Sequence, residues 1–147
     1  MFAAMGISAI LVTASILVHY EALRLMSVYV PSLPIAVRLK VLIVVLGCFV
    51  AHTIEVWLYA GAFLVIYKNG VGSLKGQVEE QFADFLYFSA TSYSTMGVGD
   101  VYPTGALRLI SGIEGINGLF LIAWSTSFTY FVMDRLWPLH PDKSNSR

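Results

Sequence analysis

The run Thr95-Met96-Gly97-Val98-Gly99-Asp100 most limits the folds open to this chain. It lies between two long apolar segments and follows a short apolar and aromatic stretch. An ordinary strand points its successive carbonyls in alternating directions. Glycine adopts left-handed dihedrals at little cost, so Gly97 and Gly99 allow consecutive carbonyls to turn to one side. The run therefore predicts a row of backbone oxygens, the ligands that replace the water of a dehydrated cation.

Composition places this motif in a membrane. Hydrophobic residues make up 57% of the 147 residues, charged residues make up 12%, and the mean hydropathy is +0.73. These values indicate an integral membrane protein with room for one domain. The net charge of zero offers no basic surface for nucleic acid. The lone cysteine, Cys48, allows no disulfide within the chain.

Apolar segments and prolines divide the chain. We expect a first span from about residue 2 to 25, followed by a break at Pro31 and Pro34, which cannot continue a helix. Residues 82–94 are too short to cross a bilayer and predict a re-entrant helix, which is tolerated when buried in protein. The predicted divisions are an added N-terminal helix and connection (1–34), a pore domain (35–137) with spans at 35–67 and 106–137, and a short tail (138–147).

Positive charge predicts the orientation. With three spans, six of the nine basic residues gather on one side, which the positive-inside rule assigns to the cytoplasm; Lys68 and Lys75 oppose this weakly and are accompanied by acidic residues. The C-terminus would then be cytoplasmic and the glycine-rich segment would open outside, most simply in the plasma (inner) membrane. The basic residues concerned are Arg24, Arg38, Lys40, Arg135, Lys143 and Arg147.

From about Val41 onward the chain resembles the two-helix pore module of the potassium channel superfamily. The resemblance is most specific from Tyr87 to Pro103, which includes a Gly-Asp-x-Tyr-Pro exit. It implies an all-α membrane protein with outer helix 35–67, pore helix 82–94, filter 95–100 and inner helix 106–137. One chain has one pore loop, so the resemblance also implies a homotetramer in the lipid bilayer.

The resemblance implies a potassium-selective channel and no enzyme. Potassium would be the permeant ligand, with no cofactor, and Asp100 would shape the outer mouth of the filter. Val98 stands where most relatives have Tyr or Phe, and Thr91 replaces a carboxylate found behind the filter in some relatives. The ion would be coordinated by backbone oxygens of Thr95, Met96, Gly97, Val98 and Gly99, with the Thr95 hydroxyl as the innermost ligand.

Three other functions remain open. The change at Val98 leaves a non-selective cation channel as an alternative. A subunit of a potassium uptake transporter is another, although such transporters tend to fuse four repeats and keep one filter glycine in each. A membrane enzyme built on His52 and Glu55 lacks a nucleophile and base arrangement.

The inner helix carries two candidate gating features. Asn117, Leu121, Ser125 and Thr129 recur every four residues, which predicts a stripe facing a water-filled path. Such polar residues can instead bond to their own or a neighbouring helix. Gly118 aligns with the usual hinge glycine of the family, although glycines spaced by three residues also permit close helix packing.

His52 and Glu55 are ionisable residues three positions apart within the second span. Intramembrane charges are costly and often functional, so we hypothesise a proton-sensitive pair that couples the outer and inner helices. The alternative is a satisfied polar pair that fixes packing. A metal site would need a third ligand from His19 or Glu21, which we expect near the cytoplasmic interface.

Overall fold

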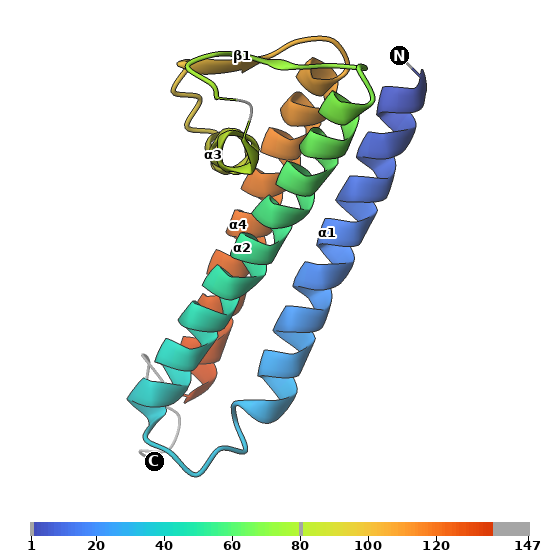
Figure 1. Ribbon diagram of the computed structural model, residues 1–147. Helices are drawn as coiled ribbons and strands as arrows, with labels where there is room; N and C mark the ends of the chain where they lie inside the picture. The colour runs from blue at the N-terminus through green and yellow to red at the C-terminus, as the bar shows by residue number, and fades with distance from the viewer. Residues whose placement is uncertain (1, 80, 137–147) are drawn as a thin grey trace, which may run out of the picture.

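The computed structural model describes residues 2–79 and 81–136. Three long helices, α1 (Phe2–Tyr29), α2 (Val37–Lys68) and α4 (Leu107–Leu136), run side by side (Figure 1). The short helix α3 (Phe82–Tyr93) is seen nearly along its axis and lies across one end of the long helices. The expected tail at 138–147, including Lys143 and Arg147, lies outside the described residues.

Each long helix has the length and composition to cross a membrane. At about 1.5 Å per residue, 28 residues or more exceed a hydrocarbon core of about 30 Å. Large apolar side chains point away from the chain, with Ile10 69% and Phe49 71% exposed, as suits contact with lipid. The prediction of an all-α membrane protein with three spans and a short helix is confirmed.

The first helix is longer than expected. It continues past residue 25 to Tyr29, because Glu21 and Arg24 pair with each other on its surface at 2.8 Å and do not interrupt it. The connection to α2 contains Pro31 and Pro34, as the sequence suggests. The division of the chain into functional parts remains a prediction.

A stripe of six buried side chains, four of them small or polar, packs α1 against the other two long helices. Its members recur at intervals of three or four residues, so they share one helix face. Small and polar residues let membrane helices approach closely and bond to each other. The buried members are Ala4, Ser8, Leu11, Ser15, His19 and Leu23.

Two short antiparallel strands hold the ends of the α3 region together. Leu74 of β1 (Leu74–Gly76) pairs with Pro103 of β2 (Val101–Pro103). Gly76 has a φ of +106°, and a Cβ atom there would meet the carbonyl of Asp100. The strands fix the chain on both sides of the Thr95–Asp100 run.

The arrangement separates the two ends of the helix bundle (Figure 1). The start of α1, the strands and α3 lie at one end. The α1–α2 connection and the end of α4 lie at the other. Arg38, Lys40 and Arg135 therefore share the end opposite the glycine-rich segment.

Candidate functional site

Helix α3 fixes the start of the glycine-rich segment. The Asp84 carboxylate accepts hydrogen bonds from the backbone N–H groups of Glu79 and Gln81, at 2.9 and 3.0 Å, which caps the N-terminus of the helix. At the other end, the Thr91 carbonyl accepts from the N–H groups of Met96 and Gly97, at 2.9 and 3.2 Å. These bonds hold the glycine-rich segment against α3. The carbonyls of the segment itself no longer follow the helical direction.

The backbone φ angle alternates between positive and negative values along the segment. Thr95, Gly97 and Gly99 have φ values of +58°, +56° and +87°, while the residues between them keep negative φ. This alternation turns successive carbonyls to one side. Within residues 2–79 and 81–136, the carbonyl oxygens of residues 95–99 accept no hydrogen bond. They are therefore available as cation ligands.

The left-handed conformation of Thr95 was not expected from the sequence. A β-branched residue rarely adopts positive φ, and such strain gathers at functional sites. The Thr95 N–H donates to the Ser92 carbonyl at 3.0 Å, which helps to hold the conformation. Glycine signals left-handed geometry in a sequence, and threonine gives no such signal.

Asp100 anchors the C-terminal end of the segment. The Tyr87 hydroxyl donates to the Asp100 carboxylate, 3.1 Å from Oδ1 and 3.0 Å from Oδ2. This hydrogen bond raises the pKa of Tyr87 above its ordinary value. The Asp100 carbonyl accepts from the Gln77 N–H at 3.0 Å. Asp100 thus links α3 to the segment that follows β1.

A family model described as "Ion channel" matches residues 41–133, from the first turns of α2 to near the end of α4. The chain belongs to this family of two-helix pore-loop ion channels. Comparison with curated proteins and with solved structures gave no significant match. Helix α1 lies outside the matched residues and is an addition to the pore module.

The α4 stripe that we expected to line a water-filled path is buried against other helices of the same chain. Asn117, Leu121 and Ser125 are 6%, 0% and 7% exposed. The Asn117 amide donates to the Ser15 hydroxyl at 2.7 Å, so α1 covers this face of α4. Thr129 is half-buried. The exposed polar side chains in this part of α4 are Thr126 and Ser127.

Two glycines of α4 give this helix close contact with the end of α3. A Cβ atom at Gly118 would meet the carbonyl of Tyr93, and one at Gly115 would lie 3.2 Å from the Ser92 carbonyl. Nothing lies within 4 Å of the corresponding position at Gly112. The packing role of Gly118 follows from these contacts, and its hinge role in channel opening remains a prediction.

A buried polar cluster joins three helices of the channel. The fully buried Glu55 lies 2.9 Å from His19 Nδ1 through Oε1 and 3.2 Å from His52 Nδ1 through Oε2. The Tyr93 hydroxyl donates to Glu55 Oε2 and lies 2.8 Å from His52 Nδ1. Sequence spacing identified the contact of His52 with Glu55 but missed Tyr93.

The structure also corrects the expected position of His19. This side chain is 0% exposed and does not reach a membrane interface. It belongs to the stripe of α1 that faces α2 and α4, so it meets Glu55 through Nδ1 and the Ser125 hydroxyl through Nε2, at 3.2 Å. Glu21 is exposed and pairs with Arg24.

A second buried carboxylate lies between α3 and α4. Glu114 is 0% exposed, and Ser89 donates to its Oε1 at 2.5 Å. Its Oε2 has no hydrogen-bond partner among the described residues. Ser89 lies on α3, so its bond places the carboxyl group of Glu114 against that helix. Thr91, on the same helix, has no carboxyl group to offer there.

Proposed function

We propose that this channel conducts potassium selectively and passively through a fourfold filter built from residues 95–99. The observation that supports this most is the alternation of positive φ at Thr95, Gly97 and Gly99, which leaves the carbonyls unbonded. Such carbonyls replace the hydration shell of a potassium ion. Thr95, Met96, Gly97, Val98 and Gly99 would coordinate the ion, and Asp100 would shape the mouth electrostatically.

A homotetramer would complete the filter. A single chain leaves Met96 69% and Val98 54% exposed, and no described residue donates to the carbonyls of residues 95–99. A groove of about 370 Å³ runs beside the filter segment, where the neighbouring subunit would pack. Its lining includes Thr91, Thr95, Gly97, Arg108, Gly115 and Ile116. Closed rotational symmetry would bring four copies of the row around one axis.

The water-filled path would follow an exposed face of α4. Phe120, Ala123 and Ser127 recur at intervals of three or four residues, and with Trp124 they line a hollow of about 430 Å³. Ser127 supplies the one hydroxyl of this set. This face replaces the buried stripe as the proposed cavity wall.

The same proposal gives the orientation. Arg38, Lys40 and Arg135 share one end of the bundle, and a cytoplasmic position for that end satisfies the positive-inside rule. The filter mouth and the start of α1 would then lie outside a plasma (inner) membrane.

A non-selective cation channel is the second candidate, and Val98 is the residue that favours it. Its isopropyl group cannot make the outward hydrogen bond of a tyrosine hydroxyl, so the filter has one brace fewer. The Tyr87–Asp100 bond at the outer end supports the selective alternative. A potassium uptake transporter is less favoured because both filter glycines are present in a chain with one pore loop.

Ion flux from liposomes separates these functions. The purified protein is reconstituted, and cation uptake is measured in matched potassium and sodium gradients over a range of concentrations. A potassium-selective channel gives flux with potassium strongly preferred and no saturation at low concentration. Equal flux of both ions indicates a non-selective pore, and saturation at low flux indicates a transporter.

A further inference from the structure

We propose that His19, His52, Glu55 and Tyr93 form a binding site for one divalent transition-metal ion of the Zn²⁺ class. The ligand atoms would be the two Nδ1 atoms, a carboxylate oxygen and the phenol oxygen. Two histidines and a carboxylate are ligands that Zn²⁺ takes in proteins. His19 supplies the third ligand that the pair on α2 lacks.

The ligand atoms lie close enough together for one ion to reach them after a local shift, with Glu55 Oε1 facing His19 and Oε2 facing His52 and Tyr93. With bonds of about 2.0–2.1 Å, two ligands of a tetrahedral zinc ion lie roughly 3.3 Å apart. The His19–Glu55 contact is 2.9 Å, and the contacts of His52 with Glu55 and Tyr93 are 3.2 and 2.8 Å. The ligand atoms of His19, His52 and Glu55 all lie within 4.8 Å of one another. To bind the ion, the atoms in contact would move apart by a few tenths of an ångström, and the most widely separated pair would close by up to about 1.5 Å.

Two hydrogen bonds satisfy one part of the cluster, but they leave its longest close contact without a hydrogen of its own. His52 Nδ1, Tyr93 Oη and Glu55 Oε2 form a triangle in which all three pairs are in contact. When the carboxylate is ionised, the triangle holds at most one N–H and one O–H hydrogen. Two hydrogens cannot give three linear bonds. A cation in the triangle would satisfy all three atoms together.

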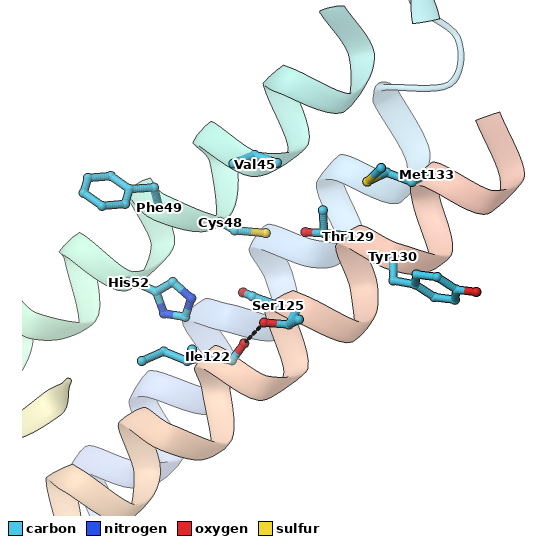
Figure 2. Close-up of a pocket in the computed structure, with 10 residues that line it drawn as sticks. Val45, Cys48, Phe49, His52, Ile122, Ser125, Thr129, Tyr130 and Met133 are labelled. Atoms are coloured by element: carbon cyan, nitrogen blue, oxygen red, sulfur yellow. Dashed lines mark hydrogen bonds between the residues drawn. The ribbon is translucent and has the colours of Figure 1, made fainter. Parts of the chain in front are cut away.

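The surroundings hold the ligands in place and give access to them. Ser125 lies 3.2 Å from His19 Nε2 and fixes that ring, as outer partners of metal-bound histidines do. His52 is partly exposed and lines an open hollow of about 480 Å³ between α2 and α4. Figure 2 shows it beside Cys48 and opposite Ser125 and Thr129. An ion would enter by this hollow.

Charge sets the pH dependence of binding. With neutral histidines, the Glu55 carboxylate carries one negative charge. If the bound ion takes the place of the Tyr93 hydroxyl proton, which leaves to water through the hollow, the site has no net charge. Metal affinity therefore falls as pH falls, because protons compete for the histidines and the phenol oxygen. Occupancy would tie the added helix α1 to α2 and to the end of the pore helix.

Cobalt binding tests the site without measuring ion flux. The full chain, purified in detergent without a polyhistidine tag and stripped of metal, is titrated with Co²⁺, which is followed by its visible absorption. Bound metal is then counted by elemental analysis after exchange with Zn²⁺. We expect one ion per chain, with about 100-fold weaker binding in His19→Gln and in the conservative Tyr93→Phe. Each variant is first checked for the oligomer size of the parent.

Two controls make the assignment specific. His140→Gln removes the one remaining histidine of the chain, and Glu114→Gln removes the other buried carboxylate. Both should bind Co²⁺ like the parent. No bound Co²⁺ at neutral pH, or equal binding by His19→Gln and the parent, would overturn the metal site. Neither result would affect the proposal of a potassium channel, which depends on the filter.

Discussion

Tyr87 and Asp100, thirteen positions apart, are joined by a hydrogen bond at the C-terminal end of the proposed filter segment. The Tyr87 hydroxyl lies 3.1 and 3.0 Å from the two carboxylate oxygens of Asp100. The backbone N–H of Val101 donates to Oδ1 of the same carboxylate at 2.9 Å. Since Val101 begins β2, one side chain connects α3, the proposed filter and the small sheet.

Replacing Tyr87 with Phe should shorten the lifetime of the conducting filter. The variant keeps the ring and removes the single hydroxyl that connects α3 to Asp100. We expect potassium current through planar bilayers to decay faster during sustained opening, with initial selectivity unchanged. Tyr102→Phe is the matched control, because Tyr102 is an exposed tyrosine of β2. If the current decayed equally fast in the two variants, the Tyr87–Asp100 bond would not stabilise the conducting filter.

The effect of Tyr87→Phe should not depend on pH in the neutral range. The hydrogen bond to Asp100 raises the pKa of Tyr87 above 10.0. A group whose pKa rises on folding stabilises the folded state fully below its unfolded pKa, about 10 for tyrosine, and the contribution is lost as pH rises through the folded value. The ratio of decay rates between variant and parent should thus stay constant from about pH 6 to about pH 9.

Gly97→Ala should abolish selective conduction without unfolding the channel. Gly97 has a φ of +56°, where a Cβ atom costs about 1–2 kcal/mol, although nothing lies within 4 Å of that atom. The strain acts on the filter dihedrals alone. The measurement is potassium and sodium flux alongside the thermal stability of the oligomer. Gly61→Ala is the control, since Gly61 is helical and equally uncrowded. Parental selectivity in Gly97→Ala would count against the filter assignment.

Thiol labelling should distinguish the two faces of the inner helix. In a Cys48→Ser background, Ser127→Cys should react with a charged methanethiosulfonate reagent, because Ser127 is exposed and lies on the proposed cavity wall. Asn117→Cys should remain unreacted, because Asn117 is buried against Ser15. Labelling is read by mass spectrometry and by block of potassium flux. The reverse pattern would restore the stripe through Asn117 as the cavity wall.

His52→Ala should flatten the pH dependence of potassium flux. Three titratable side chains face His52: Glu55 from the same helix, His19 from α1 and Tyr93 from α3. Protonation of the cluster would therefore act on the packing of three helices. Flux is measured between about pH 5 and about pH 8 in metal-chelated buffer. His140→Ala serves as the control. An unchanged pH profile in His52→Ala would leave the cluster without a role as a proton sensor.

The spans, the short helix and the filter glycines could be read from the sequence because each depends on local chemistry. Runs of apolar residues give the spans, and Gly97 and Gly99 mark the left-handed positions. The contact between His52 and Glu55 follows from their spacing on one helix. These features need no knowledge of how the helices pack.

The errors arose where tertiary packing decides the position of a residue. Asn117 and Ser125 look like cavity residues until α1 is placed over them, and His19 looks interfacial until its helix is extended to Tyr29. A signal was present, because Ser8, Ser15 and His19 form a polar stripe along α1. Such a stripe in a membrane helix indicates a partner with matching polar groups.

The reversal potential under bi-ionic conditions tests the central claim most directly. Single channels are recorded with potassium on one side of a planar bilayer and sodium on the other, and the filter proposal predicts a reversal potential set by the potassium gradient. Gly97→Ala should lose this potential or the current, while Gly61→Ala keeps both. A reversal potential near zero in the parent channel would show that sodium passes as readily as potassium, and would contradict selective coordination by residues 95–99.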